Sequence, residues 1–302
     1  MHIYGRATAF TGCEFGSGAY TITYDGMEVA SGGQYNSFET TTFGICPGDN
    51  SSSNITDLSF PSYTLEAFED ATSPQRLAYD WLLSHPNLDV LPEWNLHQKF
   101  AFATFYYSMD GDNWMDVAAR ANYLSYEVDS CEWGIEYTNV PKCDEEGRFL
   151  GLALNYVGGT MVSASVPAEL AMLTSLEILW LSGNPLVGDF VDNVPPHLSN
   201  LSEVTMDDSN IGGTLPATYI GDFTRLERFD FSRNLLTGSI PSEIGRLSLL
   251  KNLNLRSNLL SGRIPSEIGL LTNLKILNLY GNQLTGEVPS EIGLLTNLNT
   301  LT

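Results

Sequence analysis

The C-terminal half of the chain repeats one pattern of apolar and polar positions every 24 or 25 residues. The pattern reads L-x-x-L-x-L-x-x-N-x-L-x-G-x-I-P-x-x-I-G-x-L, and one of its leucines recurs as Leu226, Leu250, Leu274 and Leu298. Two consecutive copies share the same ten residues, PSEIGLLTNL, at 265–274 and 289–298. A single copy of this length cannot bury its own apolar face and needs its neighbours. The pattern therefore predicts a stack of similar coils.

Tracing the pattern towards the N-terminus gives six copies, and the polar position of each copy holds asparagine or serine. These positions are Asn155, Asn184, Ser209, Asn234, Asn258 and Asn282. They are spaced by 29, 25, 25, 24 and 24 residues, so the first copy is expected to hold about five extra residues near 162–166. Serine can form only part of the hydrogen bonds of asparagine. The coil of Ser209 is therefore expected to be the least regular.

Each part of the pattern has a structural role. Leu-x-Leu is typical of a short strand, and stacking successive strands at ~4.8 Å gives a parallel sheet on the concave side. The asparagine that follows lies at a tight turn, where its amide can bond buried backbone groups of neighbouring coils. Gly and Pro mark the turn towards the convex side, and I-G-x-L supplies inward apolar side chains there. The predicted fold is an α/β solenoid.

Two segments at the N-terminus differ from the repeats. Residues 1–46 are predicted to form a small, separate β-rich module that starts abruptly and lacks a complete sheet, because alternating β-branched and aromatic residues flank Asp25-Gly26, a hairpin turn. A further strand is predicted at 38–46. Residues 47–73, which begin with a run of polar residues, are predicted to form a linker.

Residues 74–146 are predicted to form a helical cap ahead of the solenoid at 147–302. Ser73 followed by Pro74 is a typical helix start, and apolar side chains then recur at helical spacing at Leu96, Phe100 and Tyr107. We expect these side chains to form a core that covers the first coil.

The chain holds four cysteines, Cys13, Cys46, Cys131 and Cys143, which fall into two local pairs. Four cysteines permit three connectivities, and neither spacing resembles a zinc site. N-x-S/T triplets at Asn50, Asn54 and Asn200 agree with an oxidising, secretory environment. The first residues do not resemble a signal peptide, and no run of about 20 apolar residues could span a membrane. We expect an extracellular or cell-surface chain that does not itself enter a membrane.

The repeats resemble those of plant-type leucine-rich repeat proteins, whose coils carry L-T/S-G-x-I-P. The segment Cys131-Glu132-Trp133 followed by Cys143 resembles the disulfide-bonded cap that precedes such repeats, although the gap between the cysteines is longer here. The stretches SPQRLAYDWL and FYYSMDGDNW resemble segments that precede the repeats in surface proteins of diatoms and related stramenopiles. The resemblance implies a receptor-like ectodomain or secreted binder with a parallel concave sheet.

Charge and motifs exclude several classes of function. The chain has 14 Lys and Arg against 36 Asp and Glu, a net charge of −22. Binding to nucleic acid or to an anionic lipid surface needs clustered cations, so neither is expected. The nucleophile, zinc-protease, nucleotide-binding and kinase motifs are missing, and the acidic Asp110–Trp114 stretch is better explained as a turn than as a calcium loop. No catalytic residue, metal site or cofactor is predicted.

Recognition by the concave face remains. Side chains between the strand leucines point away from the core, and neighbouring coils align them in columns. The candidate binding residues are Trp180, Glu203, Thr205, Asp207, Arg228, Asp230, Arg233, Asn254, Arg256, Asn278 and Tyr280. Tryptophan, tyrosine and arginine are typical of interaction surfaces. Asp and Arg on adjacent coils could instead pair with each other.

Three hypotheses for function follow. The first is non-catalytic recognition of a protein, peptide or glycan, and the second is a structural or adhesive matrix protein in which the solenoid is a spacer. The third, ice or surface binding, depends on hydroxyl columns such as Thr237, Ser261 and Thr285. Since the sequence ends inside a predicted strand, we expect the natural chain to continue beyond Thr302.

Overall fold

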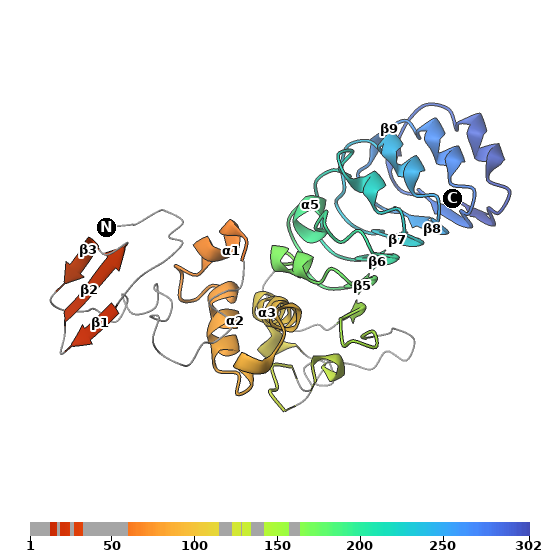
Figure 1. Ribbon diagram of the computed structural model, residues 1–302. Coiled ribbons are helices and arrows are strands. Elements are labelled where there is room, and N and C mark those ends of the chain that lie inside the picture. Colours follow the sequence, from red (N-terminus) through yellow and green to blue (C-terminus); the bar gives the residue numbers. More distant parts are fainter. Residues whose placement is uncertain are drawn as a thin grey trace. The chain divides into compact units, whose positions relative to one another are not determined.

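A computed structural model describes residues 13–16, 19–24, 27–32, 60–114, 123–127, 129–133, 142–156 and 164–302. The chain divides into one compact unit of residues 1–59 with 87–93 and a second of residues 60–86 with 94–302. In the first unit β1 (Cys13–Gly16), β2 (Ala19–Tyr24) and β3 (Met27–Gly32) form an antiparallel sheet with β2 in the middle (Figure 1). Tyr24 pairs with Met27 across the predicted hairpin turn. The predicted strand at 38–46 and residues Cys46, Asn50 and Asn54 lie outside the described residues.

The solenoid fold predicted from the repeats is confirmed. Its described strands form one parallel sheet in which the order in space follows the order in the chain (Figure 1). They are β4 (Gly151–Ala153), β5 (Ile178–Trp180), β6 (Glu203–Thr205), β7 (Arg228–Asp230), β8 (Asn252–Asn254), β10 (Ile276–Asn278) and β12 (Thr300–Leu301). The middle residue of most of these strands, such as Leu179, Phe229 and Leu253, is fully buried. Each strand therefore has one face in the core and one face outside.

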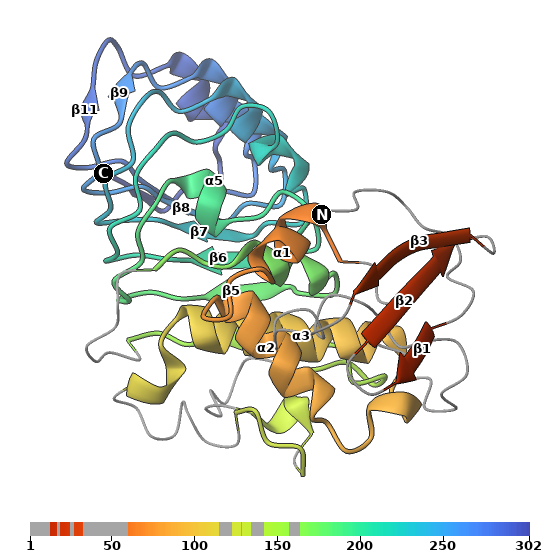
Figure 2. The ribbon, with the colours of Figure 1, turned by 90° about the vertical axis from the view of Figure 1, so that its left-hand side faces the viewer.

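Short helices form the opposite side of the coils (Figure 2). They are η6 (Ala168–Met172), α5 (Phe190–Asn193), η7 (Ile220–Asp222), η8 (Ser242–Arg246), η9 (Ser266–Leu270) and η10 (Ser290–Leu294). Pro241, Pro265 and Pro289 each stand directly before one of these helices, where proline needs no backbone donor. Between the two sides, β9 (Ser261–Gly262) and β11 (Gln283–Leu284) form a second, small parallel pair.

The first coil lies two residues out of the predicted phase. Ala153, and not Gly151, pairs with Trp180, so this coil is 27 residues long and exceeds the 24-residue coils by three. Tyr156 has a left-handed backbone (φ 53°). Asp208 and Arg233 adopt the same conformation directly before Ser209 and Asn234, the polar positions of their coils. Asn155 therefore does not stand at the polar position of this coil, and that assignment was wrong. Strand side chains alternate with a period of two, so a shift by two residues preserves the same apolar pattern.

A helical cap precedes the first coil. Its helices are α1 (Ser62–Ala67), α2 (Pro74–Leu83), α3 (Glu93–Ser108), η4 (Gly111–Asn113) and η5 (Ser130–Glu132). The short helix η3 (Leu88–Val90) belongs to the first unit. Ser73 caps α2 by accepting a hydrogen bond from the Arg76 amide at 3.1 Å. A disulfide joins Cys131 and Cys143. The core of the cap continues into the solenoid, because the rings of Phe102 and Phe149 lie 4.1 Å apart.

The predicted linker is shorter than 47–73. Helix α1 occupies its last part, and the ring of Phe60 packs 4.7 Å from Phe100 in the cap. Thr64 in α1 donates a hydrogen bond of 2.8 Å to Glu169, which is fully buried in the first coil. Helix α1 has only six residues, too few to show helical periodicity in the sequence.

Candidate functional site

The concave face consists of the outward side chains of β5, β6, β7, β8 and β10 and of the two residues that follow each of these strands. Parallel pairing places Trp180, Thr205, Asp230, Asn254 and Asn278 side by side in one column. A second column, at the starts of the same strands, contains Ile178, Glu203, Arg228, Asn252 and Ile276. A third follows the strands and contains Ser182, Asp207, Ser232, Arg256 and Tyr280. The eleven candidate residues therefore belong to this one surface, with Arg233 next to the third column.

A ladder of buried asparagines fixes the spacing of these columns. Asn258 donates to the carbonyl of Phe231 at 2.8 Å and to that of Leu255 at 3.0 Å, and its own oxygen accepts from the Leu236 amide at 3.0 Å. Asn234 and Asn282 repeat this arrangement in their coils. Each ladder residue therefore joins two coils through backbone groups that the strands leave unpaired.

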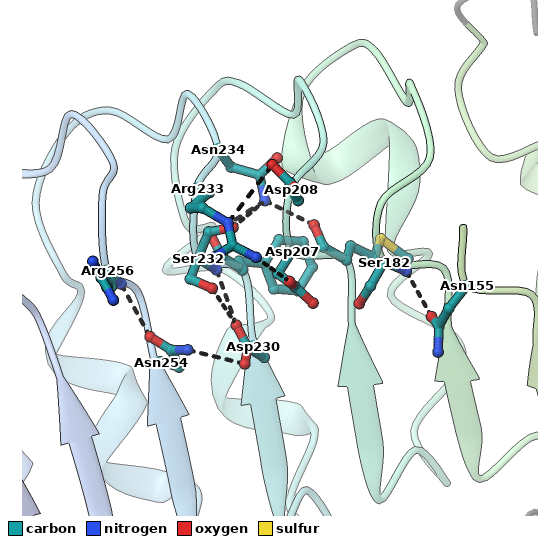
Figure 3. Close-up of polar contacts among 12 residues, drawn as sticks. Asn155, Ser182, Asp207, Asp208, Asp230, Ser232, Arg233, Asn234, Asn254 and Arg256 are labelled. Carbon is teal, nitrogen blue, oxygen red and sulfur yellow. Dashed lines mark hydrogen bonds and ion pairs between the residues drawn. The ribbon is translucent and has the colours of Figure 1, made fainter. Parts of the chain in front are cut away.

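The ladder is interrupted in the third coil. Ser209 is buried, and its hydroxyl has no hydrogen-bond partner among the described residues. The Leu186 amide, which would donate to an asparagine at this position, donates instead to the carbonyl of Asn184 at 2.7 Å. Asn155, displaced from the ladder, lies in the third column and accepts a hydrogen bond of 2.8 Å from the Ser182 amide (Figure 3).

Some of the predicted binding residues bond each other in the centre of the concave face (Figure 3). The Arg233 guanidinium lies 3.1 Å from the carboxylate of Asp207 and 3.6 Å from that of Asp208. Asp230 is 8% exposed and accepts hydrogen bonds from the hydroxyl and amide of Ser232 and from the side chain of Asn254. For these residues the alternative of pairing within the protein is the one observed.

Other predicted residues are accessible. Tyr280 is 64% exposed, and the guanidinium of Arg256 lies 5.5 Å from the centre of its ring, a cation–π contact. Arg228 is exposed, whereas Thr205 is buried and Trp180 is half-buried. Ile276, which is 36% exposed beside Lys275, was not predicted, because an isoleucine next to a strand leucine is usually part of the core.

Asn200, a predicted glycosylation site, contributes to a recurring contact between coils. Its side-chain nitrogen donates to the Thr174 carbonyl at 2.8 Å, and Asn273 and Asn297 make the same bond to Ser248 and Thr272. A glycan at Asn200 would replace one of the two hydrogens on the nitrogen that makes this bond. Modification of Asn200 stays a prediction.

In the described part of the chain no three His, Cys, Asp or Glu side chains are grouped so that they could hold a metal ion. No described helix has the length and hydropathy to cross a membrane.

Comparison with known families matches the Leucine Rich Repeat model at residues 175–201, 225–247, 249–271 and 273–295. A search of the curated proteins found no match. The fold is similar to the Arabidopsis receptor kinase HAESA in complex with the peptide hormone IDA and the co-receptor SERK1, with 25% identity and a TM-score of 0.57 over 70% of this chain. The chain covers 33% of that protein's length. A plant ice-binding protein is also similar, with 26% identity and a TM-score of 0.55 over 66% of this chain and 59% of that one.

Proposed function

We propose that this plant-type leucine-rich repeat protein binds an extracellular protein or peptide on its concave face and catalyses no reaction. The observation that carries the proposal is the set of accessible side chains on that face, Arg228, Arg256 and Tyr280, which the core does not require. The HAESA complex with a peptide hormone and a co-receptor supports the same class of partner. This chain covers 33% of HAESA's length, so the class of partner is proposed for this chain and is not carried over from HAESA.

The differences between coils favour the concave face over the convex face. The convex segments at 265–274 and 289–298 are identical, whereas the concave residues of neighbouring coils differ at several accessible positions. Asn252 and Arg256 in one coil correspond to Ile276 and Tyr280 in the next. A repeated segment cannot distinguish one coil from another, so any selectivity between partners depends on the strand residues.

We expect a triple variant, Arg228→Ala, Arg256→Ala and Tyr280→Ala, to lose the partner. The full chain would be immobilised and incubated with extracellular fluid of its source, and bound proteins and peptides would be quantified by mass spectrometry. Arg and Tyr are enriched among the few interface residues whose truncation costs about 2 kcal/mol or more, so we expect at least tenfold less captured partner.

The matched control is a triple variant on the other faces, Arg263→Ala, Leu270→Ala and Leu294→Ala. These side chains are exposed, so the control removes similar surface without touching the concave face. Circular dichroism would establish that both variants are folded. Equal capture by the concave variant and the unaltered chain would contradict the proposal.

Ice binding is a second candidate, favoured by the similarity to the plant ice-binding protein. The hydroxyls of Thr237 and Thr285 donate to the carbonyls of Gly213 and Gly262 in the preceding coils, at 3.0 and 3.4 Å, which orders them at the spacing of the repeat. On this hypothesis the chain shows thermal hysteresis, and Thr237→Val with Thr285→Val abolishes it while the concave variant retains it. A chain without thermal hysteresis would exclude this candidate.

A further inference from the structure

The charge of the chain reverses locally in the last coils. The whole chain carries 36 acids and 14 bases, but residues 244–286 contain five Lys and Arg and one acid, Glu267. Glu267 belongs to η9 on the convex side. Lys251, Arg256 and Lys275, which flank the strands of these coils, therefore form a cationic region in a strongly acidic protein.

We propose that this region binds an extended acidic peptide, and this inference rests on the proposed function of the concave face. The site, called the cationic patch below, comprises Arg228, Lys251, Arg256, Lys275, Ile276 and Tyr280. The cationic patch specifies an acidic partner, whereas the concave face as a whole does not indicate the charge of the partner.

The cations of the patch are available to a partner. Among the described residues, Arg228, Arg256 and Lys275 form no ion pair within 4 Å, although the chain has many carboxylates. Lys251 pairs with Glu227 at 2.6 Å, but both side chains are more than 40% exposed, and such pairs contribute little. By contrast, Arg233 nearby is held by Asp207 and Asp208. A ligand with carboxylates would supply the charges that the protein itself does not.

The patch also has an apolar component, which favours a peptide over a purely anionic ligand. Tyr280 is 64% exposed and Ile276 is 36% exposed, and they lie at opposite ends of the segment that follows Lys275. The ring of Tyr280 beneath the Arg256 guanidinium holds that cation in place, which lowers the entropy lost on binding. Acidic side chains would pair with the cations, while apolar side chains of the same peptide contact Ile276 and Tyr280.

The dimensions suit three or four extended residues. Ile276 and Tyr280 are four residues apart, about 13 Å at the rise of a strand, and Arg228 lies two strands from Ile276, about 10 Å. Between them the Asn278 side-chain oxygen accepts from the Tyr280 amide at 3.3 Å. The Asn278 side-chain nitrogen has no hydrogen-bond partner in the described chain and can donate to a peptide carbonyl.

The test uses fluorescence anisotropy of a labelled nine-residue peptide of Asp, Glu and two Leu residues with the full chain. We expect at least tenfold tighter binding of this peptide than of its Asn and Gln isostere, and a several-fold loss of affinity between 50 and 300 mM salt. The double variant Arg256→Gln with Lys275→Gln should weaken binding at least tenfold.

The control is the double variant Arg246→Gln with Arg263→Gln, which removes the same charge from the convex side and the flank. An equal effect of both doubles would mean that only the long-range field matters and would overturn the inference. So would equal affinity for the isostere, or tighter binding of a sulfated oligosaccharide of the same charge. If the concave face captures a native partner that ignores salt and the Arg256 double, the proposed function stands and this inference fails.

Discussion

Replacing Asn258 with alanine lowers the free energy of unfolding by about 2–3 kcal/mol. Asn258 is 4% exposed and joins two coils through its three shortest hydrogen bonds. Alanine leaves the Leu236 amide without an acceptor in a buried site. The carbonyls of Phe231 and Leu255 each keep a bond from a neighbouring asparagine, at 3.2 and 2.8 Å, which limits the cost. Urea unfolding followed by circular dichroism measures the change.

Ser209, at the same position of another coil, provides the control. Its hydroxyl has no partner among the described residues, so Ser209→Ala changes the free energy of unfolding by less than about 1 kcal/mol. Ser209→Asn supplies an acceptor for the Leu186 amide and raises stability by about 1 kcal/mol. Equal losses for Asn258→Ala and Ser209→Ala would show that the ladder bonds do not hold the coils together.

The repeats made most of the solenoid predictable from sequence. Periodic leucines determine which side chains enter the core. The pairing of Asp230 with Asn254, and of Asn254 with Asn278, follows from the 24-residue spacing. The first coil was placed two residues out of phase because leucine alternation fits both phases equally well. Only contacts with the next coil, such as the bond from Asn184 to the Leu154 carbonyl at 2.7 Å, distinguish them.

The sequence predicted which residues lie on the concave face, but not which of them bond each other and which stay accessible. Sequence spacing placed Asp207 and Arg233 near each other, but whether they bond each other depends on side-chain conformations that the pattern does not specify. The sequence also did not predict that Ile276 is exposed, because isoleucine at a strand start is compatible with burial or with exposure. The repeated pattern thus identifies the scaffold, and the contacts between coils decide which side chains remain available.

The two copies of PSEIGLLTNL allow contacts between coils to be separated from local conformation. A Cβ atom at Gly269 would lie 2.6 Å from the carbonyl oxygen of Glu291 and 2.7 Å from its Cβ, both in the following coil. A Cβ atom at Gly293, which has the same ten-residue context, would meet nothing within 4 Å. Neither glycine has a positive φ, so alanine is allowed locally at both.

In the 302-residue chain, Gly269→Ala therefore lowers the free energy of unfolding by about 1–3 kcal/mol, because the coils must separate to admit a methyl group. Gly293→Ala leaves it unchanged or raises it by up to about 1 kcal/mol, since alanine restricts the unfolded chain. Urea unfolding of both variants gives the difference directly. Equal shifts would mean that these glycines are required by the local turn. A loss at Gly269 alone would show that close approach of successive coils, which also aligns the concave columns, depends on this residue.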